Sequence, residues 1–486
     1  MSETKVRPPS PVLPLKEGGN LDAGLAARFI EIVGPKNAIT DPQALEPYLV
    51  EMRHRWHGRT TLVLRPGSVA EVSAILKLAN ETGTAIVPQG GNTGLVGGQL
   101  PYHGEIILSL NRLDKIREVD PVSNTVTCEA GVTLQRAREA AAAVDRLYPQ
   151  LLPSEGTCTI GGNLSTNAGG TAAIAYGIAR SHVLGLEVVL ADGRVMNNLN
   201  KLKKDNTGYD LKNLFIGAEG TLGIITAAVL RLVPRPRSVE TAWVGVPSAE
   251  AAVELLGLAT ERTAGGVTSF EMMARMGVEV VIKHGPNMRY PLREQYPYSV
   301  LIELSSQARS GLRESLEDIL AEGQERGLLL DATIADNLSQ GKEFWRLREM
   351  FGELQRHEGG SIKHDVSVPI AHIPAFIAEA NAAVTKLIPG ARPLPFGHVG
   401  DGNIHYNVTQ PVGADKAAFM AREDEVHDVV YAVVAKYGGS ISAEHGIGIA
   451  KREQLTHVKD KVALELMRTL KRTLDPKGIL NPGKVL

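Results

Sequence analysis

The glycines of this chain are gathered in a few places. The sequence has 486 residues and 50 glycines, and many of the glycines lie in four clusters. Glycine permits positive backbone φ angles and lets the backbone approach another group closely. Disorder does not explain the clusters, because strand-like runs of valine, isoleucine and leucine surround them and the sequence is not of low complexity. We therefore expect ordered loops that approach a ligand at residues 90–98, 156–170, 217–223 and 438–448.

The composition excludes several classes of protein. The formal net charge is −2 and aromatic residues make up 5% of the chain, so neither a basic surface nor a base-stacking platform for nucleic acid is expected. The two cysteines, Cys128 and Cys158, are too few for a disulfide framework. We expect a globular protein of a reducing compartment with no nucleic-acid partner.

The N-terminus carries no pattern typical of secretion. Residues 1–16 are rich in proline and lack the apolar core of about 7–15 residues that a signal peptide needs. No apolar run approaches the roughly 18 residues that span a bilayer. We interpret residues 1–19 as a loose arm and expect a soluble protein. The predicted location is the cytoplasm, with peripheral contact at a membrane left open.

The pattern of elements changes after residue 235. Before this point, short strands and capped helices alternate with the glycine clusters, and the sequence Pro-Arg-Pro at 234–236 then interrupts the pattern. Beyond it, strands alternate with helices, which is typical of an α+β sheet covered by helices on one face. We predict one strand across residues 119–128 and a long loop across residues 261–298.

The first glycine cluster is not a Rossmann fingerprint. Residues 88–98 read PQGGNTGLVGG and lead to Pro101 rather than into a helix, whereas a Rossmann site needs GxGxxG between a strand and a helix. Consecutive glycines after a strand can instead direct backbone N–H groups at phosphate oxygens, and the side chains of Asn92 and Thr93 add donors. The loop therefore predicts a bound phosphate group.

Four stretches together resemble a known family of flavoenzymes. PQGGNTG at 88–94, TIGGNLSTNAGG at 159–170, GAEGTLGIIT at 217–226 and DPKGILNPGK at 475–484 resemble the vanillyl-alcohol oxidase/p-cresol methylhydroxylase family of FAD enzymes. The resemblance implies an α+β fold with a two-lobed FAD-binding domain and an α+β cap domain that has an antiparallel sheet. The predicted domains are residues 1–235, with lobes at about 20–118 and 119–235, a cap at 236–435, and a C-terminal segment at 436–486 that returns to the FAD domain.

The same resemblance implies where FAD binds. The pyrophosphate would lie on the first loop, and the flavin ring would point toward the cap with Asn481 nearby. Some members attach FAD through a histidine in the first loop, where this chain has Asn92, so non-covalent FAD is expected. The expected cofactor-binding residues are Pro88, Gly90, Gly91, Asn92, Thr93, Gly94, Leu95, Gly98, Gln99, Pro153, Ser154, Thr157, Gly161, Gly162, Asn163, Thr166, Gly169, Gly170, Glu219, Gly220, Gly223, Ile225 and Asn481.

A histidine-rich hairpin is predicted at residues 393–409. Its two strands flank an Asp-Gly turn, so His405 and Asn407 share one face and His398 can face the same side. Together with Glu444 from a later glycine-bounded loop, the two histidines suit a divalent metal and leave positions open for a substrate. We expect Zn²⁺ first, with Mn²⁺ or Fe²⁺ as alternatives, acting as a Lewis acid on a substrate hydroxyl.

Other residues supply a base and positive charge. His445 has a pKa suited to take the hydroxyl proton while the α-hydride passes to flavin N5. Arg348, on a predicted helix, could hold a carboxylate together with Lys363. The spacing alone also allows Arg348 to lie on a solvated helix face beside a glutamate.

Four further motifs resemble one branch of the family. WRLRE, KHDVSVP, GHVGDGNIHYNV and SAEHGIG resemble the D-2-hydroxyglutarate and D-lactate dehydrogenase branch. One helical turn after the arginine, the hydroxyglutarate pattern has a threonine where this chain has Gly352, so the choice of acid stays open. The roles that the resemblance implies are metal ligands for His398, His405 and Glu444, the base for His445, a C1-carboxylate contact for Asn407, and distal-carboxylate contacts for Arg348 and Lys363.

The sequence thus predicts an FAD- and divalent-metal-dependent dehydrogenase. It would oxidise a D-2-hydroxy acid to the 2-oxo acid, with D-2-hydroxyglutarate as the first choice. D-lactate or D-malate dehydrogenases, and an oxidase that uses O₂, remain alternatives. The electron acceptor would be an electron-transfer flavoprotein, a quinone or a cytochrome, and a homodimer is expected only from the general frequency of such assemblies.

Overall fold

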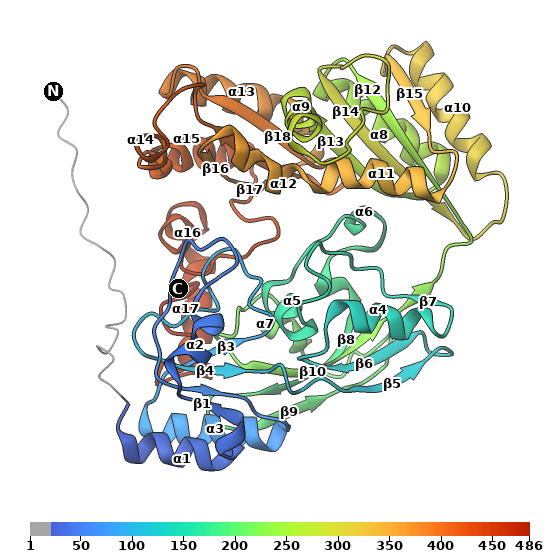
Figure 1. The fold of residues 1–486 in the computed structure, drawn as a ribbon. Helices are drawn as coiled ribbons and strands as arrows, with labels where there is room; N and C mark the ends of the chain where they lie inside the picture. The colour runs from blue at the N-terminus through green and yellow to red at the C-terminus, as the bar shows by residue number, and fades with distance from the viewer. Residues whose placement is uncertain (1–20) are drawn as a thin grey trace.

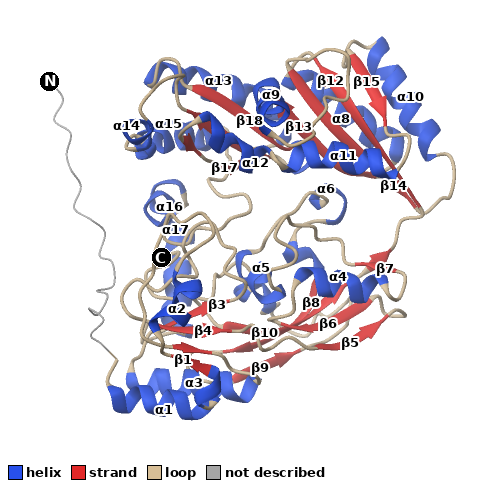
Figure 2. Cartoon of the chain, in the orientation of Figure 1, coloured by secondary structure: helices blue, strands red, loops and turns tan. Residues whose placement is uncertain are grey.

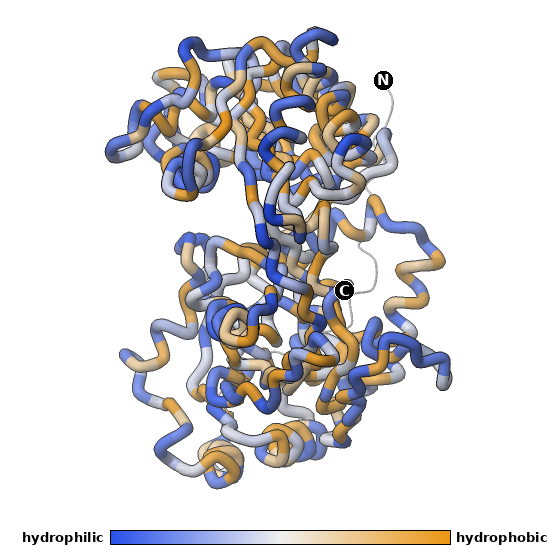
Figure 3. Tube along the Cα trace, turned by 90° about the vertical axis from the view of Figure 1, so that its right-hand side faces the viewer, coloured by the Kyte–Doolittle hydropathy of each residue, from blue (hydrophilic) through white to orange (hydrophobic). Residues whose placement is uncertain are grey.

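The computed structural model describes residues 21–486, and the arm predicted at residues 1–19 lies outside the described residues. The chain forms two parts that lie one above the other in two views at right angles (Figure 1 and Figure 3). The lower part contains the first half of the chain together with the C-terminal helices, and the upper part contains the segments between them. We propose the division into domains predicted above for these parts. Within the described residues, no helix is both long and apolar enough to cross a membrane.

The first sheet of the lower part has four strands, three of them parallel, and its strand β3 (Ile86–Gln89) leads into the first glycine cluster. Helices α1 and α3 pack on one face through a core that includes Phe29 and Ile75, and α2 packs on the other face through Leu45. The side chain of Ser68 accepts a hydrogen bond from the Glu71 N–H and so begins α3, as predicted. In order across the sheet, the strands are β1 (Ala38–Ile39), β2 (Val63–Leu64), β4 (Ile106–Ser109) and β3 (Ile86–Gln89), with helices α1 (Ala23–Val33), α2 (Pro42–Leu49) and α3 (Val69–Thr82).

The second sheet of the lower part is antiparallel (Figure 2). Short helices cover it through a core that includes Leu134, Leu164 and Phe215. A two-stranded ribbon lies at the exit toward the upper part. The strands in order are β5 (Ile116–Asp120), β6 (Thr125–Glu129), β10 (Ile224–Arg231), β8 (Val183–Val189) and β9 (Val195–Asn198); the ribbon is β7 (Arg146–Leu147) with β11 (Val233–Pro234), and the helices are α4 (Leu134–Ala142), α5 (Ile160–Thr166), α6 (Ala173–Tyr176) and α7 (Lys212–Phe215).

The upper part is built on an antiparallel sheet of eight strands, of which seven follow one another in order and the eighth, β17, pairs with β19. Its strands are β15 (Asp331–Ile334), β12 (Ser238–Val246), β14 (Tyr298–Ser306), β13 (Val267–Ala274), β18 (Arg392–His398), β19 (Asn403–Thr409) and β16 (Ser361–Ile362), with β17 at Asp365–Ser367.

Helices cover both faces of this sheet, and not one face as predicted. Ala242 and Val244 of β12 pack into the core under one group of helices, while Trp243 between them packs into the core under a second group. Alternate side chains of a strand point to opposite faces, so this strand is buried on both sides. The first group is α8 (Ala249–Thr263), α10 (Leu312–Glu325), α13 (Ile373–Leu387), α14 (Lys416–Met420) and α15 (Glu423–Lys436), and the second is α9 (Arg275–His284), α11 (Leu338–Glu349) and α12 (Phe351–Leu354).

Three predicted segments differ from the structure. The stretch 261–298 is not a loop, because it contains β13 and α9; β13 is buried on both faces and includes polar residues, so it shows no alternation. The stretch 119–128 contains two strands, because the Asp120 carboxylate accepts the N–H groups of Val122 and Ser123 and turns the chain. The second glycine cluster contains the short helix α5, which the side chain of Thr159 caps.

The C-terminal segment runs along the lower part. After α16 (Arg452–Val458) and α17 (Lys461–Leu474), the chain runs beside β3: the Ile86 N–H donates to the Ile479 carbonyl, and the Asn481 N–H donates to the Ile86 carbonyl. The buried Asp475 carboxylate accepts from the N–H groups of Ile479 and Leu480 and from Lys471 Nζ. Asp475 therefore holds the segment that contains Asn481.

We predict that Asp475→Asn loosens the C-terminal segment. Asparagine has no charge to pair with Lys471, and its NH₂ group replaces one of the two acceptor oxygens. Losing one hydrogen bond to a charged group lowers the local stability by about 1.5–3 kcal/mol. Hydrogen exchange of the Ile86 and Asn481 amides should become at least about tenfold faster. Asp460→Asn is the control, because Asp460 is an exposed N-cap on the same helix; unchanged exchange in Asp475→Asn would contradict the role assigned to the carboxylate.

Candidate functional site

Four adjacent strands of the upper sheet bring two predicted site residues, His398 and His405, together with Glu271 and Asp365. In the register of β13, β18, β19 and β17, Glu271 lies opposite His398, and His405 lies opposite both Phe396 and Asp365. Residues directly opposite each other in neighbouring strands have Cβ atoms about 4.5–5.5 Å apart and point to the same face. Strand pairing therefore brings together residues that are more than a hundred positions apart in the sequence.

His398, His405 and Glu444 form a compact group, as predicted. Nε2 of His398 lies 3.9 Å from Oε1 of Glu444, and Nε2 of His405 lies 4.0 Å from Oε2. One ligand atom from each residue lies within 4.8 Å of the others. Two imidazoles and a carboxylate at this spacing fit a first-row divalent metal such as Zn²⁺, Mn²⁺ or Fe²⁺.

The electrostatics of Glu444 and His405 suit a cation. Burial raises the pKa of Glu444 to about 7, although the neighbouring His398 opposes the shift. Burial lowers the pKa of His405 well below its usual value. A bound cation would favour the ionised carboxylate and the neutral imidazole, which are the forms that bind metals.

Asp365 organises the loop that carries Glu444 and His445. Its Oδ2 atom accepts the backbone N–H groups of Glu444 at 3.0 Å and His445 at 2.9 Å, and its Oδ1 atom accepts from Asn403 Nδ2 at 3.0 Å. Burial alone would raise its pKa, but the charges of His445 and Lys451 lower the pKa of Asp365 overall. Asp365 is therefore an ionised anchor for this loop.

His445, the predicted base, lies beside Asp365 and His405. Its Nδ1 atom is 3.4 Å from Asp365 Oδ2, and its ring lies nearly parallel to that of His405, with the ring centroids 6.2 Å apart. Burial lowers the pKa of His445 to about 4, although Asp365 opposes the shift. The imidazole is therefore neutral at pH 7 and can accept a proton.

Arg348 does not lie on a solvated helix face. It is buried, its Nε atom donates to Glu271 Oε2 at 2.8 Å, and its guanidinium lies 4.9 Å from the centre of the Phe396 ring. Its two terminal nitrogens have no hydrogen-bond partner within residues 21–486. They remain free to bind an anion.

Lys363 and Asn407 are partly engaged with the protein. Lys363 Nζ donates to the Gly352 carbonyl at 3.0 Å, and Asn407 Nδ2 donates to Gln355 Oε1 at 2.7 Å. Burial, followed by the nearby charge of Arg53, lowers the pKa of Lys363 to about 8. Gly352 itself is exposed, and a methyl group added there would meet no atom within 4 Å. Arg53 comes from the lower part, in the segment that follows α2, and brings a further cation to this region.

The three glycine loops meet one another in the lower part. A Cβ atom at Gly91 would lie 1.9 Å from the carbonyl oxygen of Thr157, and one at Gly220 would lie 2.4 Å from Pro88. The first loop therefore contacts both the second and the third so closely that only glycine fits. Asn481 Nδ2 donates to the carbonyls of Gly98 and Glu219, which ties the C-terminal segment to the same place.

Beside these loops lies a buried hydrogen-bond acceptor without a partner, as expected where a cofactor binds. Within the described residues, the buried Oδ1 atom of Asn481 has no hydrogen-bond partner. Buried polar atoms are normally paired, and a cofactor with N–H donors would satisfy this one. The residues around the loops therefore fit FAD.

Some predicted cofactor contacts take other partners in the structure. The Asn92 amide donates to the carbonyls of Pro47 and Val50, so it is not directed at a phosphate as predicted, and its backbone adopts φ +55°. The Glu219 carboxylate accepts the N–H groups of Ile447 and Gly448. The Ile225 side chain lies in the core of the second sheet, where a cofactor cannot reach it.

The glycine loops adjoin the His/Glu group directly. The Gly170 N–H donates to Glu444 Oε1 at 3.0 Å, and a Cβ atom at Gly169 would lie 2.3 Å from the same oxygen. The second loop of the lower part thus positions a candidate metal ligand of the site. This contact joins the two sites that the sequence predicted separately.

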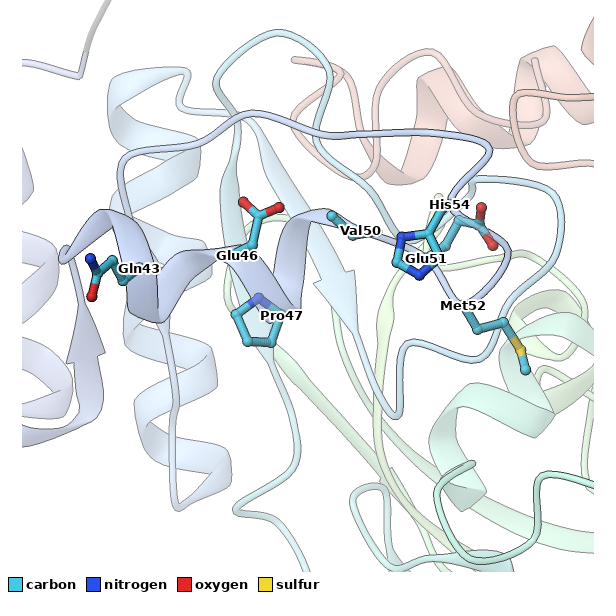
Figure 4. A pocket seen from close by; sticks show the side chains of 7 residues that line it. All are labelled: Gln43, Glu46, Pro47, Val50, Glu51, Met52 and His54. Carbon is cyan, nitrogen blue, oxygen red and sulfur yellow. The ribbon is translucent and has the colours of Figure 1, made fainter.

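A shallow hollow of about 530 Å³ lies elsewhere (Figure 4). It is formed by α2 and the segment after it, and its lining includes none of the predicted site residues. Its lining residues are Gln43, Glu46, Pro47, Val50, Glu51, Met52 and His54.

Glu271, Asp365 and Arg53 were not predicted as members of the site. Asp365 stands in the KHDVSVP motif two residues after the predicted Lys363, so its position was the available signal. Glu271 lies in a stretch interpreted as loop, and Arg53 lies in a segment without a motif. Only strand pairing and the packing of the two parts bring these two residues to the site.

Convergent glycine loops beneath a sheet that carries a His/Glu group define this chain as a flavin-dependent oxidoreductase. Two family matches agree: an FAD binding domain over residues 60–198, and the C-terminal domain of FAD-linked oxidases over residues 235–485. The chain belongs to the FAD-linked oxidase family.

Solved structures confirm the predicted fold. p-Cresol methylhydroxylase superposes with a TM-score of 0.74 at 18% identity, covering 95% of this chain and 96% of that chain. An alkyldihydroxyacetonephosphate synthase gives a TM-score of 0.72 at 18% identity, covering 97% of this chain and 88% of that chain. The fold is therefore that of the p-cresol methylhydroxylase type.

Relatives of higher identity narrow the class of reaction. A protein of Arabidopsis thaliana named D-2-hydroxyglutarate dehydrogenase, mitochondrial, is 38% identical over 467 residues, covering 96% of this chain and 82% of the relative. A D-2-hydroxyglutarate dehydrogenase of Xanthomonas citri pv. viticola is 38% identical over 448 residues, covering 92% and 93%. A D-2-hydroxyglutarate–pyruvate transhydrogenase of Saccharomyces cerevisiae is 36% identical over 456 residues, covering 92% and 90%. The chain is an FAD-dependent oxidoreductase that acts on a hydroxy acid.

The predicted cytoplasmic location is contradicted by these comparisons. Relatives from Arabidopsis thaliana, Danio rerio and Rattus norvegicus are named mitochondrial. The prediction rested on the lack of an apolar secretion core, which does not bear on import into mitochondria, because such import uses amphipathic segments of a different composition.

We predict that Gly91→Ala abolishes flavin binding. The new methyl group would collide with the Thr157 backbone, and the two loops would have to separate. The flavin-to-protein absorbance ratio of the purified variant should fall below about a tenth of the wild-type ratio. Gly156→Ala in the second loop is the control, because its methyl group would meet only the flexible end of Gln135 at 3.3 Å. Full flavin content in Gly91→Ala would contradict the close contact of the loops.

Proposed function

We propose that this chain oxidises D-2-hydroxyglutarate to 2-oxoglutarate with the help of a divalent metal held by His398, His405 and Glu444. The observation that carries the proposal is the contact of Gly170, in a cofactor loop, with Glu444. Because the contact joins a predicted FAD loop to a candidate metal ligand, it supports the hypothesis that a metal and a flavin act on the same substrate. The names of the relatives support the choice of acid.

The oxidation of an alcohol needs a hydride acceptor, a Lewis acid and a base. When bound, FAD supplies a hydride acceptor and the divalent metal supplies a Lewis acid for the substrate hydroxyl. Asp365 faces Nδ1 of His445 and leaves Nε2 of that ring to take the hydroxyl proton. With the proton on His445, the α-hydrogen leaves with its electron pair and the alcohol becomes a ketone.

The cations of the site bind the substrate carboxylates. The free guanidinium nitrogens of Arg348 and the ammonium of Lys363 suit the distal carboxylate of a dianion, since charge-assisted hydrogen bonds to carboxylates are strong. The second amide hydrogen of Asn407 is available for the C1 carboxylate, because the first is donated to Gln355. A monocarboxylate such as D-lactate would leave Arg348 and Lys363 without an anion.

Gly352 bears on the choice between acids, because the hydroxyglutarate pattern has a threonine at this position. Gly352 has no side-chain hydroxyl to bind a distal carboxylate, and its backbone carbonyl accepts a hydrogen bond from Lys363 Nζ. D-lactate and D-malate are therefore tested in the same experiments as D-2-hydroxyglutarate.

We predict that chelation blocks reduction of the flavin by D-2-hydroxyglutarate. Under anaerobic conditions the acid should bleach the flavin absorbance, and removal of the metal should slow bleaching at least about a hundredfold, because a Lewis acid contributes several kcal/mol. Adding Zn²⁺ or Mn²⁺ back should restore the rate. Rapid bleaching by metal-free protein would contradict the role of the metal, and bleaching by D-lactate alone would contradict the substrate.

We predict that Lys363→Met selectively weakens binding of dicarboxylates. Loss of a hydrogen bond to a charged group, worth about 1.5–3 kcal/mol, should raise the KM for D-2-hydroxyglutarate roughly 10- to 100-fold. The kcat/KM for D-lactate should change by less than about threefold. Lys342→Met is the control, because Lys342 is an exposed lysine on α11. An equal loss with both acids would show that Lys363 does not bind the distal carboxylate.

A further inference from the structure

Glu271 stands between the candidate metal and the candidate substrate anchor. It lies in the middle of β13, and its side chain is 0% exposed. One carboxylate oxygen, Oε1, lies 2.5 Å from His398 Nδ1, and the other, Oε2, lies 2.8 Å from Arg348 Nε. Each oxygen therefore holds a different residue of the site.

The contact with His398 determines which ring nitrogen faces the site. Because Nδ1 is directed at Glu271, Nε2 is the nitrogen that lies 3.9 Å from Glu444. A carboxylate on the outer nitrogen orients a metal-binding imidazole and makes it a stronger ligand. Glu271 is the residue placed to do this for His398.

The contact with Arg348 determines where its free nitrogens point. Glu271 holds the Nε edge of the guanidinium, and the Phe396 ring supports its face at 4.9 Å. The Phe396 ring is in turn 5.1 Å from that of His405. The guanidinium is thus held at its Nε edge by Glu271 and over one face by Phe396. These two contacts fix the direction in which its remaining nitrogens point.

We propose that Glu271 is a positioning residue that holds the metal ligand His398 and the substrate anchor Arg348 in one fixed geometry. The proposal rests on the proposed function, since it assumes a metal at His398 and a dicarboxylate at Arg348. Its consequence is that one buried side chain sets both metal affinity and preference for a dicarboxylate. A purely structural ion pair would affect stability and neither of these properties.

The test is the isosteric variant Glu271→Gln in the flavin-containing protein. Competition with a chromophoric chelator should show Zn²⁺ affinity reduced about 10- to 100-fold, a measurement that needs no turnover. At saturating Zn²⁺, the KM for D-2-hydroxyglutarate should rise at least tenfold.

Glu303→Gln is the matched control. Glu303 lies on the neighbouring strand β14 and accepts a hydrogen bond from Trp345 of α11, as Glu271 accepts one from Arg348 of the same helix. It contacts neither a candidate metal ligand nor a candidate substrate anchor among the described residues. Its variant should keep both the wild-type Zn²⁺ affinity and the wild-type KM.

The outcomes separate the two proposals. Wild-type protein that binds no Zn²⁺ would overturn the proposed metal site, and the role of Glu271 with it. Wild-type protein that binds Zn²⁺, together with a Glu271→Gln variant of unchanged affinity and KM, would overturn the role of Glu271 alone. If Glu271→Gln does not fold, Glu271→Asp keeps the charge but shortens the side chain, and the same two losses are expected.

Discussion

The antiparallel pairing of β13, β18, β19 and β17 is the constraint on which the rest of the site depends. Strands in register place opposite residues on one face at a fixed spacing. This register places Glu271 opposite His398, and His405 opposite Asp365, in two neighbouring rows on one face of the sheet. Because the side chains of a strand alternate between faces, a shift of one residue in β18 would turn His398 and Phe396 away from this face. The sheet thus determines the geometry of the site before any ligand binds.

Contacts between the two parts complete the site. The Gly170 N–H of the lower part binds Glu444, and the Glu219 carboxylate binds the backbone of Ile447 and Gly448 just beyond it. On the other side, Arg55 after α2 forms two hydrogen bonds at 2.8 Å with Glu423 of α15. The Asp365 carboxylate of the upper part accepts the N–H groups of Glu444 and His445, so the loop between residues 438 and 448 is held from both parts. A Cβ atom at Gly446 would lie 2.7 Å from Glu219 Oε1, and one at Gly448 would lie 2.2 Å from the Val96 carbonyl oxygen, so these close contacts favour glycine.

Buried charge is balanced locally throughout the site. Burial would raise the pKa of Glu271, but the charges of His398 and Arg348 lower it to about 2. Burial likewise would lower the pKa of His398, but Glu271 raises it to about 9. A buried charge without a partner costs several kcal/mol, so removing one member of such a group exposes the others to that cost. Each charged residue of the site therefore also determines the state of its neighbours.

The sequence by itself determined the class of fold and most of the site. Glycine clusters, the hairpin with alternating histidines, and Glu444 next to His445 are local patterns, and local patterns can be recognised without knowing the fold. Only the tertiary structure decided that Asn92 is bonded to the end of α2, that Arg348 is buried, and that Glu271 and Arg53 belong to the site. These facts depend on strand register and on the packing of distant segments. No local pattern encodes them, because the partners of each residue lie far away in the sequence.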